Sequence, residues 1–137
     1  MENLAQKVKI SALWMFLGID LTIVYTLKDS YPGNGGLQQM YAGLPPEQLS
    51  LLLLGDSAIR LAPFALAVLS LTVNDALSRK GNLVLGFIFT IASFFGLATL
   101  ISPLTIANAY LLLTQAAGIA ATAMVVLYAY RWPKNGS

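Results

Sequence analysis

The stretch LLLLGDSAIRLAPFALAVL, residues 51–69, decides the fold because it is apolar over nearly its whole length. A helix needs about 20 apolar residues to cross the hydrocarbon core of a bilayer. Two opposite charges, Asp56 and Arg60, nevertheless lie inside this stretch, four residues apart. Residues i and i+4 share one face of a helix, so the two side chains are expected to contact each other.

The composition of the whole chain agrees with a membrane protein. Of its 137 residues, 57% are hydrophobic and 10% are charged, and the mean hydropathy is +0.71. An ordinary soluble domain carries about 25% charged residues, so the lipid bilayer is the predicted partner of most of this surface. The formal net charge is only +2, and no basic stripe alternates with aromatic residues, which argues against nucleic acid as a partner.

The residue types that are missing limit the chemistry. The chain has no cysteine and no histidine. This excludes disulfides and thiolate chemistry, and it removes the commonest metal ligand and the side chain best suited to proton transfer near neutral pH. No phosphate-binding loop or nucleophile elbow is present either. The sequence therefore predicts no cofactor, no metal and no catalytic residue, and an enzyme is the least favoured class.

Three further stretches resemble the first in length and hydrophobicity. In lipid the backbone polar groups have no outside partner, so spanning segments must be helices. The sequence predicts an all-α, four-helix transmembrane bundle forming a single domain over residues 1–137. The helices are expected at about 8–28, 46–77, 82–101 and 104–131. The breaks between them are YPGNGG at 31–36, the polar run NDALSRKGN at 74–82, and Ser102-Pro103.

The basic residues predict the orientation of this bundle. Cytoplasmic loops of membrane proteins are enriched in Lys and Arg. One side of the predicted bundle holds six such residues and the other only Lys28; the six are Lys7, Lys9, Arg79, Lys80, Arg131 and Lys134. Both termini are therefore expected in the cytoplasm, and the protein is expected in the inner (plasma) membrane as a multi-pass protein.

The depth of the intramembrane charges suggests one polar site. Asp20 lies eight residues before Lys28, and Asp56 lies seven residues after Leu49. At about 1.5 Å per residue these positions are roughly 12 Å and 10 Å inward, so the two acids are expected at one level. Arg60 lies one turn deeper and is expected within reach of both. Such a cluster is a functional candidate by default; the alternative, left open here, is an ion pair that fixes helix register.

Polar and small residues also recur on one face of the last predicted helix. Asn108 and Gln115 lie on that face and complete the candidate binding set with Asp20, Asp56 and Arg60. The run AAGIAATA at 116–123 is typical of a helix-packing surface, because small residues let membrane helices approach closely. This face is the candidate contact for a homo-oligomer.

Several segments resemble a family of small bacterial four-helix integral membrane proteins of unknown function. The resemblance begins at KISALWMF (9–16) and continues with Pro63–Ser70, with Asn82 opening the third helix, and with LYAYRWP (127–133). It covers most of the chain and implies a four-helix integral membrane fold without implying an activity. It also implies that Asp20 corresponds to an acid in the family's first helix.

The chain departs from the family pattern at two places. Members tend to carry an acid just before the proline of the second helix, where this chain has Leu61 beside Arg60. They also tend to carry an acid in the fourth helix, where this chain has Gln115. Two functions stay open at this point: a small transporter or channel-like protein that uses the polar site, and a membrane-embedded accessory or structural subunit whose ion pair is purely structural.

Overall fold

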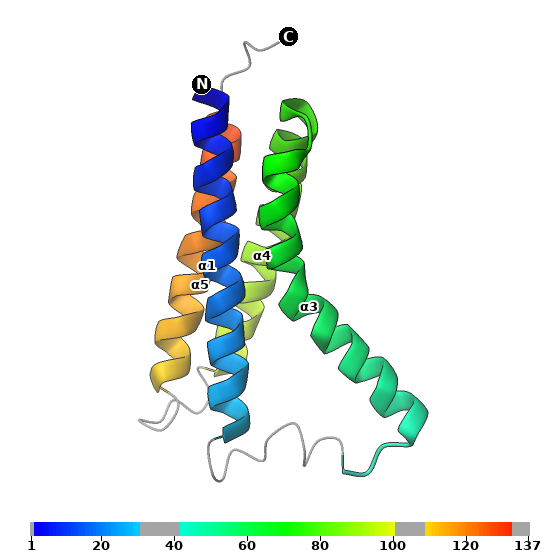
Figure 1. Cartoon of the computed structure of the whole chain (residues 1–137). Helices are drawn as coiled ribbons and strands as arrows, with labels where there is room; N and C mark the ends of the chain where they lie inside the picture. The colour runs from blue at the N-terminus through cyan, green and yellow to red at the C-terminus, as the bar shows by residue number, and fades with distance from the viewer. Residues whose placement is uncertain (1, 31–41, 101–108, 133–137) are drawn as a thin grey trace.

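The computed structural model describes residues 2–30, 42–100 and 109–132. These residues form four α-helices and no strand (Figure 1). The helices are α1 (Glu2–Ser30), α3 (Pro46–Thr72), α4 (Asp75–Leu100) and α5 (Ala109–Tyr130). All four are long and apolar enough to cross a membrane. The prediction of an all-α chain with four membrane-length helices is confirmed.

The helices pack in the order α3, α1, α5, α4. α1 lies against α3 on one side and against α5 on the other, and α5 lies against α4, whereas α3 and α4 contact each other little. The start of α1, the end of α5 and the turn between α3 and α4 lie together at one end of the molecule, called here the terminal end (Figure 1). The opposite end, where α1 ends and α3 begins, is called the loop end.

The core of the molecule is built around α1. Its buried apolar side chains meet residues of α3, of α5 and of the two residues after α5 in one cluster, made of Ile10, Trp14, Leu17, Ala67, Val125, Ala129 and Trp132. The indole of Trp14 is fully buried. It meets the ring of Phe89 on α4 edge to face, with 5.3 Å between ring centroids. Trp14 therefore brings α1 into contact with α4, although the two helices otherwise touch little.

The turn between α3 and α4 comes earlier in the chain than the sequence predicts, and it has two residues where the predicted helices leave four. The second helix was expected to reach residue 77 and the third to begin at 82, but α3 ends at Thr72 and α4 begins at Asp75. Asn74 explains the early start: its side-chain oxygen accepts a hydrogen bond of 2.9 Å from the backbone N–H of Leu77. This is the bond of an N-cap residue, and an acid such as Asp75 in the first turn adds favourable charge there.

Two other helix ends differ from the prediction or fall outside the structure. α1 begins at Glu2 and not near residue 8, because Asn3 and Lys7 bond to Asp75 across the helix interface and extend the packed part of α1 beyond its apolar span. The predicted start of the last helix at 104 lies outside the described residues.

α3 bends away from the bundle toward its loop end (Figure 1). The bend coincides with Pro63, which lies inside the helix; a proline removes one backbone hydrogen bond and pushes against the preceding turn, which kinks a helix. On the terminal side of the bend, Phe64 packs against α1 so closely that a Cβ atom at Gly18 would lie 2.7 Å from its ring. Residues 46–62, called here the diverging segment, leave the bundle beyond this contact.

Candidate functional site

The ion pair predicted from the sequence is present. Arg60 Nη2 lies 2.7 Å from Asp56 Oδ2 on the same face of α3. Both residues belong to the diverging segment, and their side chains are partly covered, with 27% of Arg60 and 18% of Asp56 exposed. A single charge at the bilayer centre costs about 3 kcal/mol on insertion scales, and direct pairing is the simplest way to offset most of that cost.

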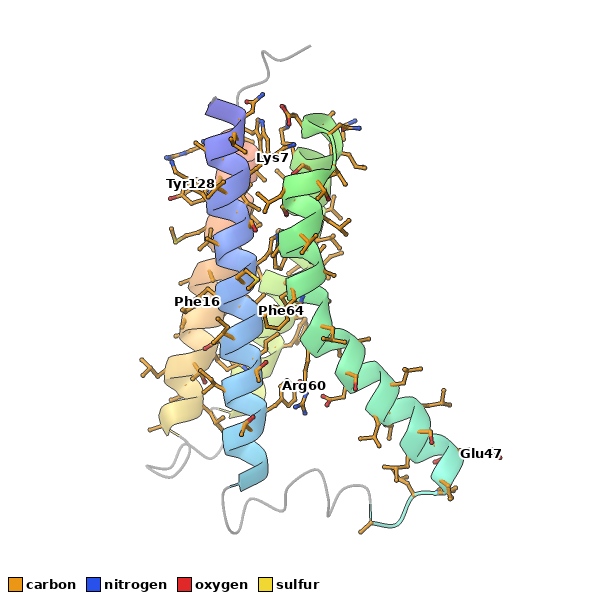
Figure 2. The ribbon with its side chains drawn as sticks, viewed as in Figure 1. Lys7, Phe16, Glu47, Arg60, Phe64 and Tyr128 are labelled. Carbon is orange, nitrogen blue, oxygen red and sulfur yellow. The ribbon has the colours of Figure 1, made fainter. Side chains whose placement is uncertain are left out.

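Arg60 reaches across from α3 to α1. Its side chain points toward α1 from the base of the diverging segment (Figure 2). The guanidinium carbon lies 4.3 Å from the centroid of the Tyr25 ring, a cation–π contact. The Nε atom of Arg60 is buried and has no hydrogen-bond partner among the described residues. The site thus consists of Asp56, Arg60 and Tyr25, with one buried guanidinium N–H left unused.

Asp20 is not part of this site. It is 9% exposed and lies against α5, where a Cβ atom at Gly118 would be 3.2 Å from its Oδ2 atom. Successive residues of a helix are about 100° apart, so Asp20, five residues before Tyr25, lies about 140° around α1 from it. Within the described part of the chain no ion pair joins Asp20 to a basic residue. The structure therefore separates the two acids that the depth argument placed together.

The remaining predicted site residues lie elsewhere. Gln115 faces α4, where its amide nitrogen would be 3.3 Å from a Cβ atom at Gly96. Asn108 lies outside the described residues. The four predicted residues that the structure describes are thus divided between the α1–α3 contact, the α1–α5 contact and the α4–α5 contact, and of these four only Asp56 and Arg60 are brought together.

The small-residue face of the fourth helix already has a partner inside the chain. Gly118, Ala121 and Thr122 are buried, and Gly118 packs against Leu17 and Asp20 of α1. The absent side chain at Gly118 is what allows the Asp20 carboxyl to fit there. Homo-oligomer formation itself stays a prediction, and this part of α5 is not free to serve it.

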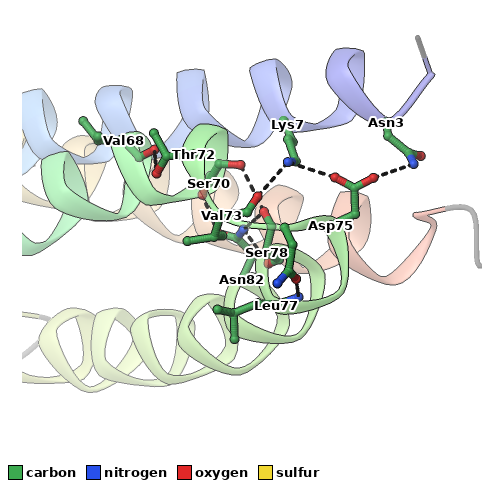
Figure 3. Close-up of polar contacts among 11 residues, drawn as sticks. Asn3, Lys7, Val68, Ser70, Thr72, Val73, Asp75, Leu77, Ser78 and Asn82 are labelled. Carbon is green, nitrogen blue, oxygen red and sulfur yellow. Dashed lines mark hydrogen bonds and ion pairs between the residues drawn. The ribbon is translucent and has the colours of Figure 1, made fainter. Parts of the chain in front are cut away.

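A polar network that the sequence did not reveal joins α1, α3 and α4. Its members on α3 and α4, Ser70, Ser78 and Asn82, are drawn in Figure 3. The side-chain oxygen of Asn82 accepts hydrogen bonds from Trp14 Nε1 at 2.6 Å and from Ser70 Oγ at 3.0 Å. Its amide nitrogen donates to the backbone and side-chain oxygens of Ser78, at 2.7 and 3.2 Å. All four residues are buried. Ser70 and Asn82 are polar residues of the second and third predicted helices, but nothing local in the sequence signals that Trp14 meets Asn82.

A second contact that the sequence did not reveal joins α1 to the α3–α4 turn at the terminal end. Lys7 Nζ lies 2.8 Å from Asp75 Oδ1 and donates a hydrogen bond of 2.7 Å to the backbone carbonyl of Val73 (Figure 3). Asn3 donates to the other oxygen of Asp75 at 2.7 Å. Lys7 therefore satisfies a carbonyl at the end of α3 and pairs with an acid at the start of α4. In the sequence it was only one of the six basic residues that set the orientation.

A groove of about 260 Å³ runs between α3 and α4 near the terminal end. It is lined mainly by apolar side chains, with Ser70, Ser78 and Asn82 as its polar members. These three are engaged in the network described above, so the groove presents no side chain that needs a polar ligand. No group of three acidic, histidine or cysteine residues that could hold a metal ion occurs in the described ranges.

Comparison with known proteins yields no relative. No protein-family model matches the chain, and no curated protein or solved structure matches it significantly. The resemblance to the small four-helix membrane family therefore stays a prediction, and any function must be argued from the geometry above.

Proposed function

We propose that the protein is a polytopic inner-membrane protein, with both termini in the cytoplasm, that moves a small polar solute across the membrane. The ion pair of Asp56 and Arg60 is its binding site. The observation that carries the proposal is that this pair lies on a membrane-length helix and is only partly covered by its own chain. Charged residues inside membrane spans are costly, and they are functional-site candidates by default.

The two ends of the molecule support a direction of access. At the terminal end, Lys7 and Asp75 hold α1 to the α3–α4 turn, and the Asn82 network joins α1, α3 and α4 next to it. At the loop end, the diverging segment leaves α1 beyond the contact of Phe64 with Gly18 (Figure 2). A solute would therefore reach Arg60 from the loop end. The excess of basic residues at the terminal end supports a loop end that lies outside the cell.

The experiment is a flux screen in proteoliposomes. Uptake of zwitterionic, anionic and cationic solutes would be compared for the wild type and for a variant with both Asp56→Leu and Arg60→Leu. The double replacement removes both charges of the pair together, so neither Asp56 nor Arg60 is left without its partner, and the variant is expected to fold and to lose uptake. Glu47→Gln is the matched control, because Glu47 is an exposed acid in the first turn of the same helix. Equal uptake of every solute by wild type and double variant would contradict the proposal.

A second function is favoured by a different observation. The diverging segment exposes consecutive leucines, with Leu51 70% and Leu54 69% exposed, and this is the shape of a helix that packs on another membrane protein. In that case the chain is an accessory subunit and the ion pair fixes the register of α3. The same double replacement distinguishes the two functions. If the ion pair is purely structural, replacing it with two leucines leaves the thermal unfolding temperature equal or higher, and neither the wild type nor the variant takes up solute.

A further inference from the structure

The groove between α3 and α4 is open toward the surroundings of the bundle, because two of its lining side chains, Leu69 and Leu77, are exposed. Its polar members are buried and already hydrogen-bonded to one another. The groove extends from Val73 at the α3–α4 turn to Leu66, seven residues or about 10 Å along α3. Both helices are long and apolar enough to cross a membrane. In a membrane-inserted chain the groove therefore opens to lipid and suits an apolar occupant.

We propose that the groove binds one acyl chain of an anionic phospholipid, with the phosphate of the lipid at Lys80. The size of the groove favours an acyl chain over a helix of another protein. One helical turn, about 10 Å wide and about 5.4 Å long, occupies about 420 Å³, whereas the groove holds about 260 Å³. The inference rests on the membrane insertion that the proposed function includes, but it does not depend on solute transport.

Lys80 provides the charge that an anionic headgroup requires. It is exposed, and neither ion pair of the described residues includes it. It lies three residues after Leu77 and is therefore about 60° around α4 from that open edge of the groove. A lysine lays its apolar stem along the protein surface and carries its ammonium group toward the headgroups. Basic groups next to a site between membrane helices on the cytoplasmic side are typical of anionic lipid binding.

Gly81 offers a way to fill the groove. It lines the groove, and a Cβ atom added there would have nothing within 4 Å. Gly81→Leu therefore places a branched apolar side chain where the acyl chain would lie. Gly55 is the matched control, because a Cβ atom there also meets nothing within 4 Å, but it belongs to the diverging segment of α3 and does not line the groove.

The first test uses Trp14 as the reporter. Its Nε1 atom donates to Asn82, which lines the groove, and its indole is fully buried. Trp132→Phe leaves Trp14 as the single tryptophan of the chain. Proteoliposomes of phosphatidylcholine would contain a minor fraction of phosphatidylglycerol with a brominated acyl chain, or the same fraction of brominated phosphatidylcholine. The brominated phosphatidylglycerol is expected to quench Trp14 fluorescence several-fold more strongly. Equal quenching by the two lipids, or none, would overturn the proposal.

The second test locates the lipid on the molecule. In the same background, Gly81→Leu is expected to remove the extra quenching by phosphatidylglycerol, and Gly55→Leu to leave it unchanged. Lys80→Gln is expected to remove the preference for phosphatidylglycerol. Lys9→Gln is its control, because the Lys9 ammonium lies over the ring of Tyr128 on α5, and it should leave the preference intact. Equal effects of the two glycine variants, or of the two lysine variants, would place the lipid elsewhere and overturn the proposal.

Folding of the variants would be checked by size exclusion in detergent. If Gly81→Leu does not fold, the comparison of the two brominated lipids and the pair of lysine variants decide. A groove that serves a second membrane protein would leave the purified chain with no preference between the lipids, which overturns the proposal. Quenching is measured without any solute, so a negative flux screen leaves this inference standing, whereas a chain that does not insert into the vesicles contradicts both.

Discussion

At the scale of single residues, the side chain of Asn82 takes part in four hydrogen bonds of the buried polar network. Its amide oxygen accepts from α1 and α3 through Trp14 and Ser70, and its amide nitrogen donates to Ser78 one turn back on α4. The amide thus links three helices while leaving none of its own groups unsatisfied. A buried donor that loses its acceptor bears the full cost of its desolvation, which is larger than the net gain of the bond. The network should therefore be sensitive to loss of this one side chain.

We predict that Asn82→Leu destabilises the protein by about 2 to 4 kcal/mol. Two buried donors, Trp14 Nε1 and Ser70 Oγ, lose an acceptor, at a cost of about 1–3 kcal/mol each. The total is kept below the sum of the two upper values because Ser70 keeps its bond to the Leu66 carbonyl. Thermal unfolding in detergent measures the loss, and the emission maximum of Trp14 should shift. Thr90→Val is the control, because Thr90 Oγ1 bonds only within its own helix, to the Gly86 carbonyl. A stability loss no larger than that of the control would show that the network contributes little.

At the scale of the helix, α3 is two different elements joined at Pro63. The terminal-side half is held by α1: Phe64 rests on Gly18, and Ala67 and Ser70 are buried. The diverging segment has no buried residue. Proline at position 63 removes the N–H that would bond to the carbonyl of Ile59 one turn earlier. The bend therefore follows from one covalent feature of the sequence, whereas the direction of the bend follows from what the terminal-side half packs against.

We expect Pro63→Ala to straighten α3 and bring the diverging segment closer to α1. The measurement is the distance between spin labels at Ile23→Cys and Leu53→Cys, both on exposed positions near the loop end, in protein diluted with unlabelled chain. Restoring the missing backbone bond should shorten this distance and narrow its distribution. The reference pair, Leu4→Cys with Leu77→Cys at the terminal end, should not change. A longer or unaltered Ile23–Leu53 distance would mean that packing and not proline sets the bend.

At the scale of the whole molecule, the sequence predicts what depends on composition and local spacing. The four membrane-length helices follow from the length of the apolar stretches, and the contact of Asp56 with Arg60 follows from the geometry of one helix. The position of Asp20 could not be predicted in the same way. Depth along a helix can be counted from the sequence, but rotation about its axis depends on packing, and here Gly118 provides the space that turns Asp20 toward α5.

The α3–α4 turn at the terminal end also shows that packing partners distant in the sequence cannot be predicted from local sequence. The polar run 74–82 is predicted to be a break between helices, with Asn82 opening the next one. Ser78 is instead helical, and both Ser78 and Asn82 are buried, because Ser70 and Trp14 are their hydrogen-bond partners. Partners that lie far away in the sequence can make a polar segment part of the core, and no local pattern indicates them. Lys7 and Asp75, 68 positions apart in the chain, are a second instance.

The orientation of the whole bundle is the last prediction. Six Lys and Arg residues belong to the terminal end and one to the loop end of the predicted topology, so the terminal end should face the cytoplasm. In the cysteine-free chain, Gly43→Cys and Ala76→Cys place single reactive groups at exposed positions of the loop end and the terminal end. A membrane-impermeant maleimide applied to intact cells should label Gly43→Cys, and Ala76→Cys only after permeabilisation. The unmodified chain is the control for background labelling, and the reverse pattern would place the termini outside.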